Sequence, residues 1–399
     1  MKLRGIRRRL SGWKLHRYVE RCRYRIFCRR EKRRKKRPYS QSVLWTTAFR
    51  LESGDDEFAR IISSPQEFLK AGDETVICTR GSVVIRLPEV MDFEKNYEAS
   101  ARALSIFRRA LEAGKRISYI GFENLKEISP ACIMAFSSYA DIWKRRAPAV
   151  HTRCETWSPE VVDAFAQIGV FDMLHVRHGL TDMKNAGSRR YLPLRSCSIQ
   201  TGEGHDVGTE TKRLRKQIEE LTGRSLSRVR MYDSVTEAIF NVRNHAYKGM
   251  VPGRLPFRWW FSVSYEKATN ELGVILFDHG YGIPATMLRS TKFERFRSFF
   301  SGQEGGWTEA SRLYIAFERD RHKIETAQAL IEGRGHGCQD IARLVLAEEH
   351  NDVKEGSKLS VISGRARYDF TGSDISSRGK SESLPYKLQG TLIEWKIKL

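Results

Sequence analysis

Residues 258–284, RWWFSVSYEKATNELGVILFDHGYGIP, constrain the fold more than any other stretch of this chain. The pattern predicts a β-hairpin that turns near Asn270, with an apolar second strand that ends at Asp278. Gly280 and Gly282 follow within four residues. A carboxylate at the end of a buried strand, with side-chain-free backbone beside it, indicates a pocket at that end of a sheet.

A second feature is a polar row within an otherwise amphipathic helix, residues 234–249. Glu237, Asn241 and His245 recur every four residues. At 100° per residue a four-residue step drifts by only about 40°, so the three side chains line one face while the apolar residues face the core. A carboxylate, an amide and an imidazole in a row indicate the wall of a ligand site. For this helix taken alone, a solvated stripe is the alternative interpretation.

Two further glycine-containing segments complete the pattern. Gly333, Gly335 and Gly337 precede a helix, and such a loop exposes backbone N–H groups that bind anions. The loop lacks the Lys-Ser/Thr pair of a P-loop. Gly390-Thr391 stands at the start of an apolar terminal strand.

The four elements E-x-x-x-N, D-x-G-x-G-I, G-x-G-x-G and G-T occur in this order within residues 210–399. The arrangement resembles the GHKL superfamily of ATPases (gyrase, Hsp90, histidine kinases, MutL), and EAIFNVRNHAY is especially similar to anti-sigma-factor serine kinases and sensor kinases. The resemblance implies a Bergerat-type α/β sandwich, with a mixed sheet and helices on one face. It also implies ATP and Mg²⁺ as cofactors.

The same resemblance implies a role for each element. Asn241 would coordinate Mg²⁺, which takes amide and phosphate oxygens. Glu237 would be the catalytic residue that polarises the attacking water or a protein hydroxyl, and Asp278 would accept the adenine amino group. The other residues expected around the nucleotide are His245, Gly280, Gly282, Ile283, Gly333, Arg334, Gly335, His336, Gly337 and Thr391. His245 contacts either phosphate or lid, or only packs locally, and surface roles are equally open for Arg334 and His336.

Residues 285–332 separate D-x-G-x-G-I, the Asp element, from G-x-G-x-G, the glycine element. Family members use this interval as a lid over ATP. Phe293, Phe296 and Phe300 share a helical face, and glycines at 302, 305 and 306 would serve as hinges. A packed helical insertion is the alternative for the same residues.

Residues 75–180 alternate predicted strands and helices, which indicates a second, smaller α/β domain. The predictions include an amphipathic helix over residues 96–114, a strand over residues 150–157, and helices that begin at the Ser-Pro pairs of residues 129–130 and 158–159. Its element order is weakly similar to the STAS domain of anti-sigma-factor antagonists, which implies a protein-binding module. Where that family often carries a phosphoacceptor run, this chain has ISPAC, so phosphorylation is not expected and Ser129 is interpreted as a helix cap. Residues 182–209, rich in Gly, Ser and Arg, are predicted to be a linker.

The net charge of +22 is concentrated at the N-terminus, because residues 1–38 hold 18 of the 70 Lys and Arg and only two acidic residues. This basic arm, residues 1–40, suits phosphate backbones or an anionic membrane surface, and a solvated tail without a specific partner is equally consistent. No secretory signal is recognised, and the seven cysteines show no CxxC spacing. A cytoplasmic location is therefore expected.

The leading functional hypothesis is a regulatory ATPase or protein kinase that contacts a protein partner through its STAS-like domain. A gyrase-like or Hsp90-like function is not expected. Such members need a transducer domain after the nucleotide domain, and only eight residues follow Thr391. The first helix of the ATPase-like region, TKRLRKQIEEL, contains no phosphoacceptor His, which argues against an orthodox histidine kinase. The alternative is a nucleic-acid-binding or membrane-surface protein that uses its basic arm, with ATP as a conformational ligand. The oligomeric state is left open.

Overall fold

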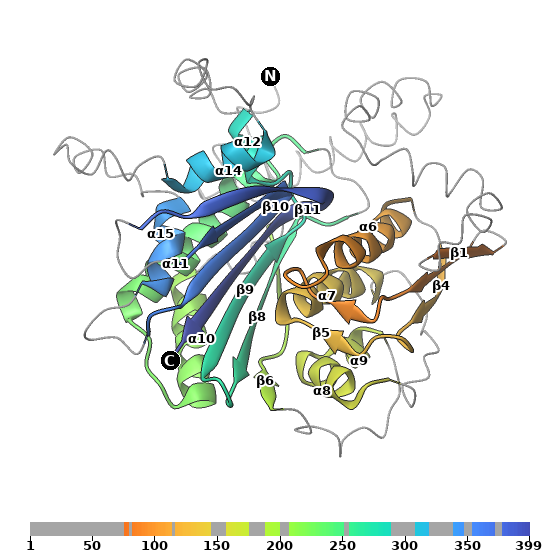
Figure 1. Ribbon diagram of the computed structural model, residues 1–399, viewed down its shortest axis with the longest axis horizontal. Coiled ribbons are helices and arrows are strands. Elements are labelled where there is room, and N and C mark those ends of the chain that lie inside the picture. The colour runs from red at the N-terminus through yellow and green to blue at the C-terminus, as the bar shows by residue number, and fades with distance from the viewer. Residues whose placement is uncertain are drawn as a thin grey trace, which may run out of the picture. The chain divides into compact units, whose positions relative to one another are not determined.

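The computed structural model describes residues 76–79, 82–113, 116–144, 157–174, 188–199, 207–250, 255–288, 308–318, 338–346, 353–371 and 377–399 (Figure 1). The described residues all belong to one compact unit, the second unit, Arg60–Leu399. The predicted basic arm, residues 1–40, lies outside them.

The second unit is built around a large antiparallel sheet. Its strands run in the order β10 (Lys358–Phe370), β11 (Lys380–Lys398), β9 (Glu271–Asp278), β8 (Arg258–Glu266) and β6 (Arg189–Tyr191), and β7 (Arg195–Ser198) also pairs with β8. The turn between β8 and β9 places Asn270 at a positive φ of 52°, a conformation that Asn tolerates better than most residues. The hairpin predicted to turn near Asn270 is therefore confirmed.

Two sequence-based expectations about this sheet are wrong. The expected sheet was mixed, whereas every described pairing in it is antiparallel. Residues 182–209 were expected to be a linker, but within them β6 and β7 are hydrogen-bonded to β8. These strands have only three and four residues, too few for strand periodicity to stand out in the sequence.

Helices α10 (Val207–Thr222), α11 (Arg228–Asn241), α14 (Glu309–Glu318) and α15 (Cys338–Ala342) pack with one face of the sheet in a single apolar core. The buried residues of α10 are Val207, Thr211, Leu214 and Ile218, a helical spacing that places them on one side. Trp395 of β11 is completely buried, and its indole N–H donates to the carbonyl oxygen of Ile341 at 2.7 Å. A side chain of this size contributes about 2–3 kcal/mol through burial alone.

The opposite face of the sheet is covered as well, by the N-terminal part of the same unit. Helix α7 (Pro130–Lys144) packs against β8 and β9, and α6 (Tyr97–Ala113) packs against β11 (Figure 1). The helices of the C-terminal region thus lie on one face of the sheet, as expected, whereas the cover of the other face by the N-terminal helices was not predicted. Strands β8 and β9 carry apolar side chains on both faces, so both faces must be packed against other elements. The predicted N-terminal domain packs against the second face.

The N-terminal layer, residues 76–174, follows the predicted element order. Strands β1 (Val76–Thr79), β2 (Ser82–Arg86) and β4 (Arg116–Gly121) form one small sheet, and β3 (Val90–Met91) pairs with β5 (Glu127–Ile128). The remaining elements of the layer are α8 (Pro159–Ile168) and α9 (Val170–Met173). The strand predicted over residues 150–157 falls almost wholly outside the described residues.

The two Ser-Pro helix starts are confirmed. Helix α7 begins at Pro130, and the backbone N–H of Cys132 donates to Ser129 Oγ at 3.4 Å, so Ser129 acts as the predicted cap. Helix α8 begins at Pro159 with no hydrogen bond from its backbone to the Ser158 side chain. There the fixed φ of proline is the remaining local signal for the helix start.

Candidate functional site

The predicted polar row lies on α11 and on the turn that continues it. Glu237 and Asn241 are partly exposed on α11, whereas Val235 and Ile239 are buried on its other side. After Asn241 the chain continues as a π-helix, η4 (Val242–Ala246), in which His245 is exposed. The wider π turn was not expected, and such turns are frequent at functional sites.

Helix α11 is fastened to the segment that directly follows the glycine element. Ser234 Oγ donates to the carbonyl oxygen of Asp340 at 2.6 Å. Two turns further along α11, Asn241 Nδ2 lies 4.0 Å from Sγ of Cys338, the residue that follows Gly337 in the sequence. The chain therefore leaves the glycine element beside the amide that was predicted to hold Mg²⁺.

The Asp element docks on the other end of the polar row. The backbone N–H of Tyr281 donates to the carbonyl oxygen of Ala246 at 2.8 Å, and the backbone N–H of Gly280 donates to Asp278 Oδ1 at 2.6 Å. A Cβ at Gly280 would lie 2.4 Å from the Ala246 oxygen. Glycine is thus required here by contact with η4, a reason that does not involve a ligand.

Asp278 lies directly opposite Thr391 of β11 in the strand register. Both residues are buried, and Thr391 Oγ1 lies 3.0 Å from Ser363 Oγ on β10. The Ser363 hydroxyl also accepts the backbone N–H of Ile283 at 2.8 Å and lies 3.2 Å from the carbonyl oxygen of Gly390. The structure therefore brings the D-x-G-x-G-I and G-T elements into one hydrogen-bonded cluster.

Ser363 was not predicted as a site residue. It occupies a bulge of β10 that the adjacent Gly364, at a φ of +65°, makes possible. A single Ser-Gly pair within a long strand is too common to single out, although the break in strand alternation at that point was available in the sequence.

Gly282 has a φ of +87°, which favours glycine. A Cβ there would lie 2.9 Å from Ser363 Oγ and 3.1 Å from the Gly390 oxygen. The bare side of Gly282 therefore faces protein, and the loop geometry alone accounts for the glycine.

Burial makes the largest contribution to the pKa shifts of Asp278, Glu237 and His245. The pKa of Asp278 is raised to about 7 by burial, against the lowering effect of hydrogen bonds from the backbone of Gly280 and Thr391. Burial, and next the charge of Asp340, raise the pKa of Glu237. The pKa of His245 is lowered, first by burial and then by Lys248. Asp278 and Glu237 are thus carboxyl groups that hold a proton more readily than ordinary ones.

Part of the predicted site lies outside the described residues. This applies to Gly333, Arg334, Gly335, His336 and Gly337, and to most of the predicted lid, 285–332. Residues 285–288 belong to α12 (Ile283–Leu288), and α14 is packed into the core through Leu313 and Phe317. Tyr368 Oη donates to Glu318 Oε1 at 2.6 Å. Residues 309–318 thus form a packed helix, whereas Phe293, Phe296 and Phe300, on which the lid and its alternative depend, lie outside the described residues.

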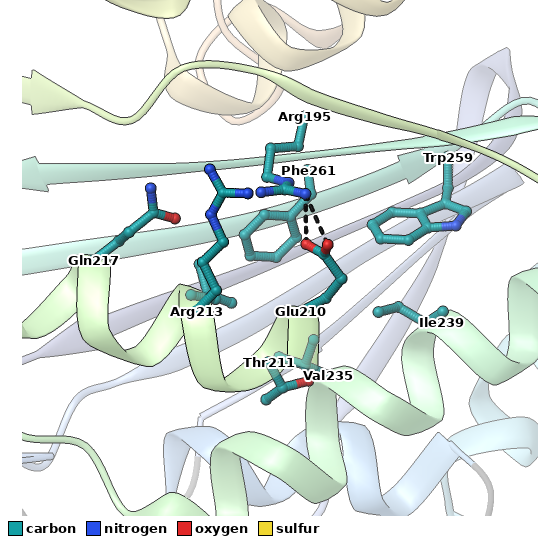
Figure 2. Close-up of a pocket in the computed structure, with 10 residues that line it drawn as sticks. Arg195, Glu210, Thr211, Arg213, Gln217, Val235, Ile239, Trp259 and Phe261 are labelled. Atoms are coloured by element: carbon teal, nitrogen blue, oxygen red, sulfur yellow. Dashed lines mark hydrogen bonds and ion pairs between the residues drawn. The ribbon is translucent and has the colours of Figure 1, made fainter. Parts of the chain in front are cut away.

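A solvent-open depression of about 330 Å³ lies between α10, α11, β7 and β8 (Figure 2). It is lined by Arg195, Glu210, Thr211, Arg213, Leu214, Gln217, Val235, Ile239, Trp259 and Phe261. Arg195 and Glu210 form an ion pair of 2.7 Å at its rim. The depression is on the opposite side of α11 from Glu237 and Asn241, and it contains none of the predicted site residues.

No protein-family model matches the chain, and no curated protein matches its sequence. The helices and strands define an α/β protein. Among the described residues, no cluster of three His, Cys, Asp or Glu side chains could hold a metal ion. No helix in the same part of the chain is long and apolar enough to span a bilayer.

Proposed function

We propose that residues 210–399 bind ATP with Mg²⁺, and that the protein hydrolyses ATP or transfers its γ-phosphate to a protein partner. One observation carries the proposal. Asp278 and Thr391, which are 113 positions apart in the sequence, are direct cross-strand neighbours beside the end of the helix that carries Glu237 and Asn241. Three of the four GHKL-like elements thereby meet in one region.

The chemistry of these side chains fits an adenine nucleotide. Asp278 is a buried carboxyl group whose Oδ1 already accepts the backbone N–H of Gly280, and it would accept the adenine amino group through its remaining lone pairs. Asn241 would offer its amide oxygen to Mg²⁺, which supplies charge neutralisation to the phosphates when bound. Ile283 and Thr391 would border the adenine, and Gly333, Gly335 and Gly337 would bind the phosphates through backbone N–H groups.

Glu237 is the candidate general base. Its raised pKa suits proton abstraction near neutral pH better than that of an ordinary glutamate. Water and a hydroxyl group of a protein partner are the two candidate nucleophiles. The pKa of His245 is lowered, which disfavours the charged imidazole, so this exposed side chain would contribute through hydrogen bonds.

Calorimetric titration of the full chain with ATP, with and without Mg²⁺, tests the proposal. We expect Asp278→Asn to weaken binding at least tenfold and Asn241→Ala to abolish the Mg²⁺-dependent part. Asn244→Ala is the matched control, because Asn244 is an exposed amide three residues after Asn241, within η4. Absence of ATP binding by the unaltered chain would refute the proposal, as would equal effects of the two asparagine variants.

Incubation with γ-labelled ATP separates the two reactions. Hydrolysis releases labelled phosphate, whereas transfer leaves the label on a protein. Glu237→Gln should lower either rate at least a hundredfold while leaving ATP affinity within threefold of the unaltered chain. Loss of affinity without a change in turnover would reassign Glu237 to binding.

We further propose that the N-terminal layer, residues 76–174, recognises a regulatory protein, which its weak STAS-like element order supports. Crosslinking of cellular partners with and without ATP tests this proposal. Recovery of the same partner from a chain that lacks these residues would contradict it.

A second candidate function rests on the basic residues 1–38. Their charge favours binding to nucleic acid or to an anionic membrane surface, with ATP as a conformational ligand. Binding to either polyanion should weaken steeply with salt and disappear when these residues are deleted. An unchanged affinity and salt dependence after deletion would refute this candidate.

A further inference from the structure

We propose that α7 of the N-terminal layer positions Asp278 for nucleotide recognition, and that it does so through His279. This inference rests on the proposed function for its ligand. The geometric relationship between α7 and the Asp278 loop stands on its own contacts.

His279 follows Asp278 and points to the opposite face of the sheet, as alternation along a strand requires. Its side chain is 3% exposed. The imidazole stacks on Tyr139 of α7 with ring centroids 4.4 Å apart and an interplanar angle of 13°, and Trp260 of β8 packs against it, also at 4.4 Å. The ring is therefore held between the sheet and α7.

One hydrogen bond fixes the orientation of the imidazole ring within this packing. His279 Nε2 lies 2.8 Å from Ser138 Oγ on α7, and Ser138 Oγ donates its only proton to the carbonyl oxygen of Ala135 at 2.7 Å. Ser138 must then accept, so Nε2 carries the imidazole proton. Nδ1 has no hydrogen-bond partner within the described residues. Burial holds the pKa of His279 well below its ordinary value, so the ring stays neutral.

The backbone of His279 is tied to the other side of the site. Its N–H donates to Tyr247 Oη at 2.9 Å, and Tyr247 directly follows η4. The peptide between Asp278 and His279 is consequently fixed from two sides, by α7 through the imidazole and by Tyr247 through the backbone. Loosening the α7 side would allow the Asp278 carboxyl group to turn away from its position.

A second contact keeps α7 in register with the sheet. Asp141 Oδ2 accepts the indole N–H of Trp260 at 3.1 Å and the hydroxyl of Ser196 at 2.9 Å. Trp260 thus contacts both His279 and α7. The N-terminal layer is in this way a supporting layer for the Asp278 loop.

The test uses the full chain and two variants that break the link in different ways. Ser138→Ala removes the hydrogen-bond acceptor, and His279→Phe keeps an aromatic ring but removes the donor. His279→Gln is the rescue variant, because its amide can still donate to Ser138. Phe165→Leu is the matched control, since Phe165 of α8 is fully buried in the same layer and stacks on Phe136 at 5.6 Å, not on His279.

The discriminating readout is base selectivity. Adenine presents an amino donor where guanine presents a carbonyl acceptor, so a well-placed Asp278 favours ATP over GTP. We expect Ser138→Ala and His279→Phe to reduce this preference at least fivefold, His279→Gln to retain more of it than His279→Phe, and Phe165→Leu to leave it unchanged. Uniform loss of ATP and GTP affinity in all four variants would indicate general destabilisation and overturn the inference.

Hydrogen exchange provides a readout that does not require nucleotide. The amide of Gly280, which donates to Asp278, should exchange at least tenfold faster in Ser138→Ala and His279→Phe than in Phe165→Leu. Unchanged protection would overturn the inference even when ATP binds normally. Faster exchange together with no ATP binding by the unaltered chain would refute the proposed function and leave the positioning role of α7 intact.

Discussion

Thr391 stands directly opposite Asp278 in the ladder between β11 and β9, and its hydroxyl lies 3.0 Å from that of Ser363. The carboxyl group at the end of β9 therefore has a polar cross-strand neighbour on β11, and that neighbour in turn contacts a serine on β10. This cluster lies at the end of the sheet that contacts η4, the continuation of the helix carrying Glu237 and Asn241.

ATP binding should strengthen as pH rises from 6 to 8. The pKa of Asp278 is about 7 because of burial, and the ionised carboxylate accepts the adenine amino group better than the protonated form does. We expect up to about a tenfold gain per pH unit below that pKa, measured by calorimetry in buffers of different ionisation heat. Asp278→Asn should show only the pH dependence of the nucleotide phosphates. An identical slope in both proteins would contradict the assignment.

The free energy of unfolding should fall as pH rises from 5 to 7 and then level off. Burial raises the pKa of Glu394 to about 7, partly opposed by Lys396, and in the unfolded chain the pKa returns to about 4.5. The folded state thus binds more protons between these values, so stability present at low pH is lost as pH approaches 7.

Glu394→Gln should remove this contribution, which is at most about 1.4 kcal/mol per pH unit. Asp278 contributes with the same sign in the same range, so part of the slope should remain. Glu94, whose pKa is lowered to about 2 by Lys396 and Lys358 against the opposing effect of burial, acts in the opposite direction and at lower pH. Denaturant titrations of both proteins at several pH values measure the difference.

Ser363→Ala should destabilise the protein by about 1–3 kcal/mol. The substitution leaves the partly buried backbone N–H of Ile283 without its acceptor and removes the buried hydroxyl contact with Thr391. Ser360→Ala, at another buried serine of β10, provides the comparison. A larger loss at Ser360 in urea titration would contradict the role given to Ser363.

Gly390→Ala should destabilise far more than Gly223→Ala. Both glycines have positive φ, +95° and +68°, but a Cβ at Gly390 would lie 1.8 Å from the Asp278 carbonyl oxygen, whereas nothing lies within 4 Å at Gly223. The conformational cost alone is about 1–2 kcal/mol. The clash adds to it only at Gly390, where it should also weaken ATP binding. Similar melting temperatures for the two variants would show that β11 and β9 separate easily at this point.

Local patterns predicted the parts of this protein that depend on local physics. The hairpin at Asn270, the α7 and α8 starts at Ser-Pro, and the amphipathic face of α6 all follow from turn preferences, fixed φ angles and apolar spacing over a few residues. The four polar and glycine elements were likewise visible in the sequence, and three of them meet in the described structure.

The features that the sequence did not predict share one cause. Strands β6 and β7 are held by β8, some 60 to 80 residues later in the sequence, and the second face of the sheet is covered by helices that precede it by more than 100 residues. No local pattern encodes such pairings. The π turn after Asn241 is another example, because the sequence around it reads as a continuous α-helix.

The sequence by itself determined the hairpin at Asn270, the helix starts at Ser-Pro and the chemical groups of the four elements. Only the tertiary structure decided what those groups meet: Thr391 beside Asp278, Ser363 beside Thr391, and Ser138 and Tyr139 around His279. The physical reason is that turn chemistry and helical periodicity act over a few residues. Burial and hydrogen bonding between distant segments exist only once the chain has folded.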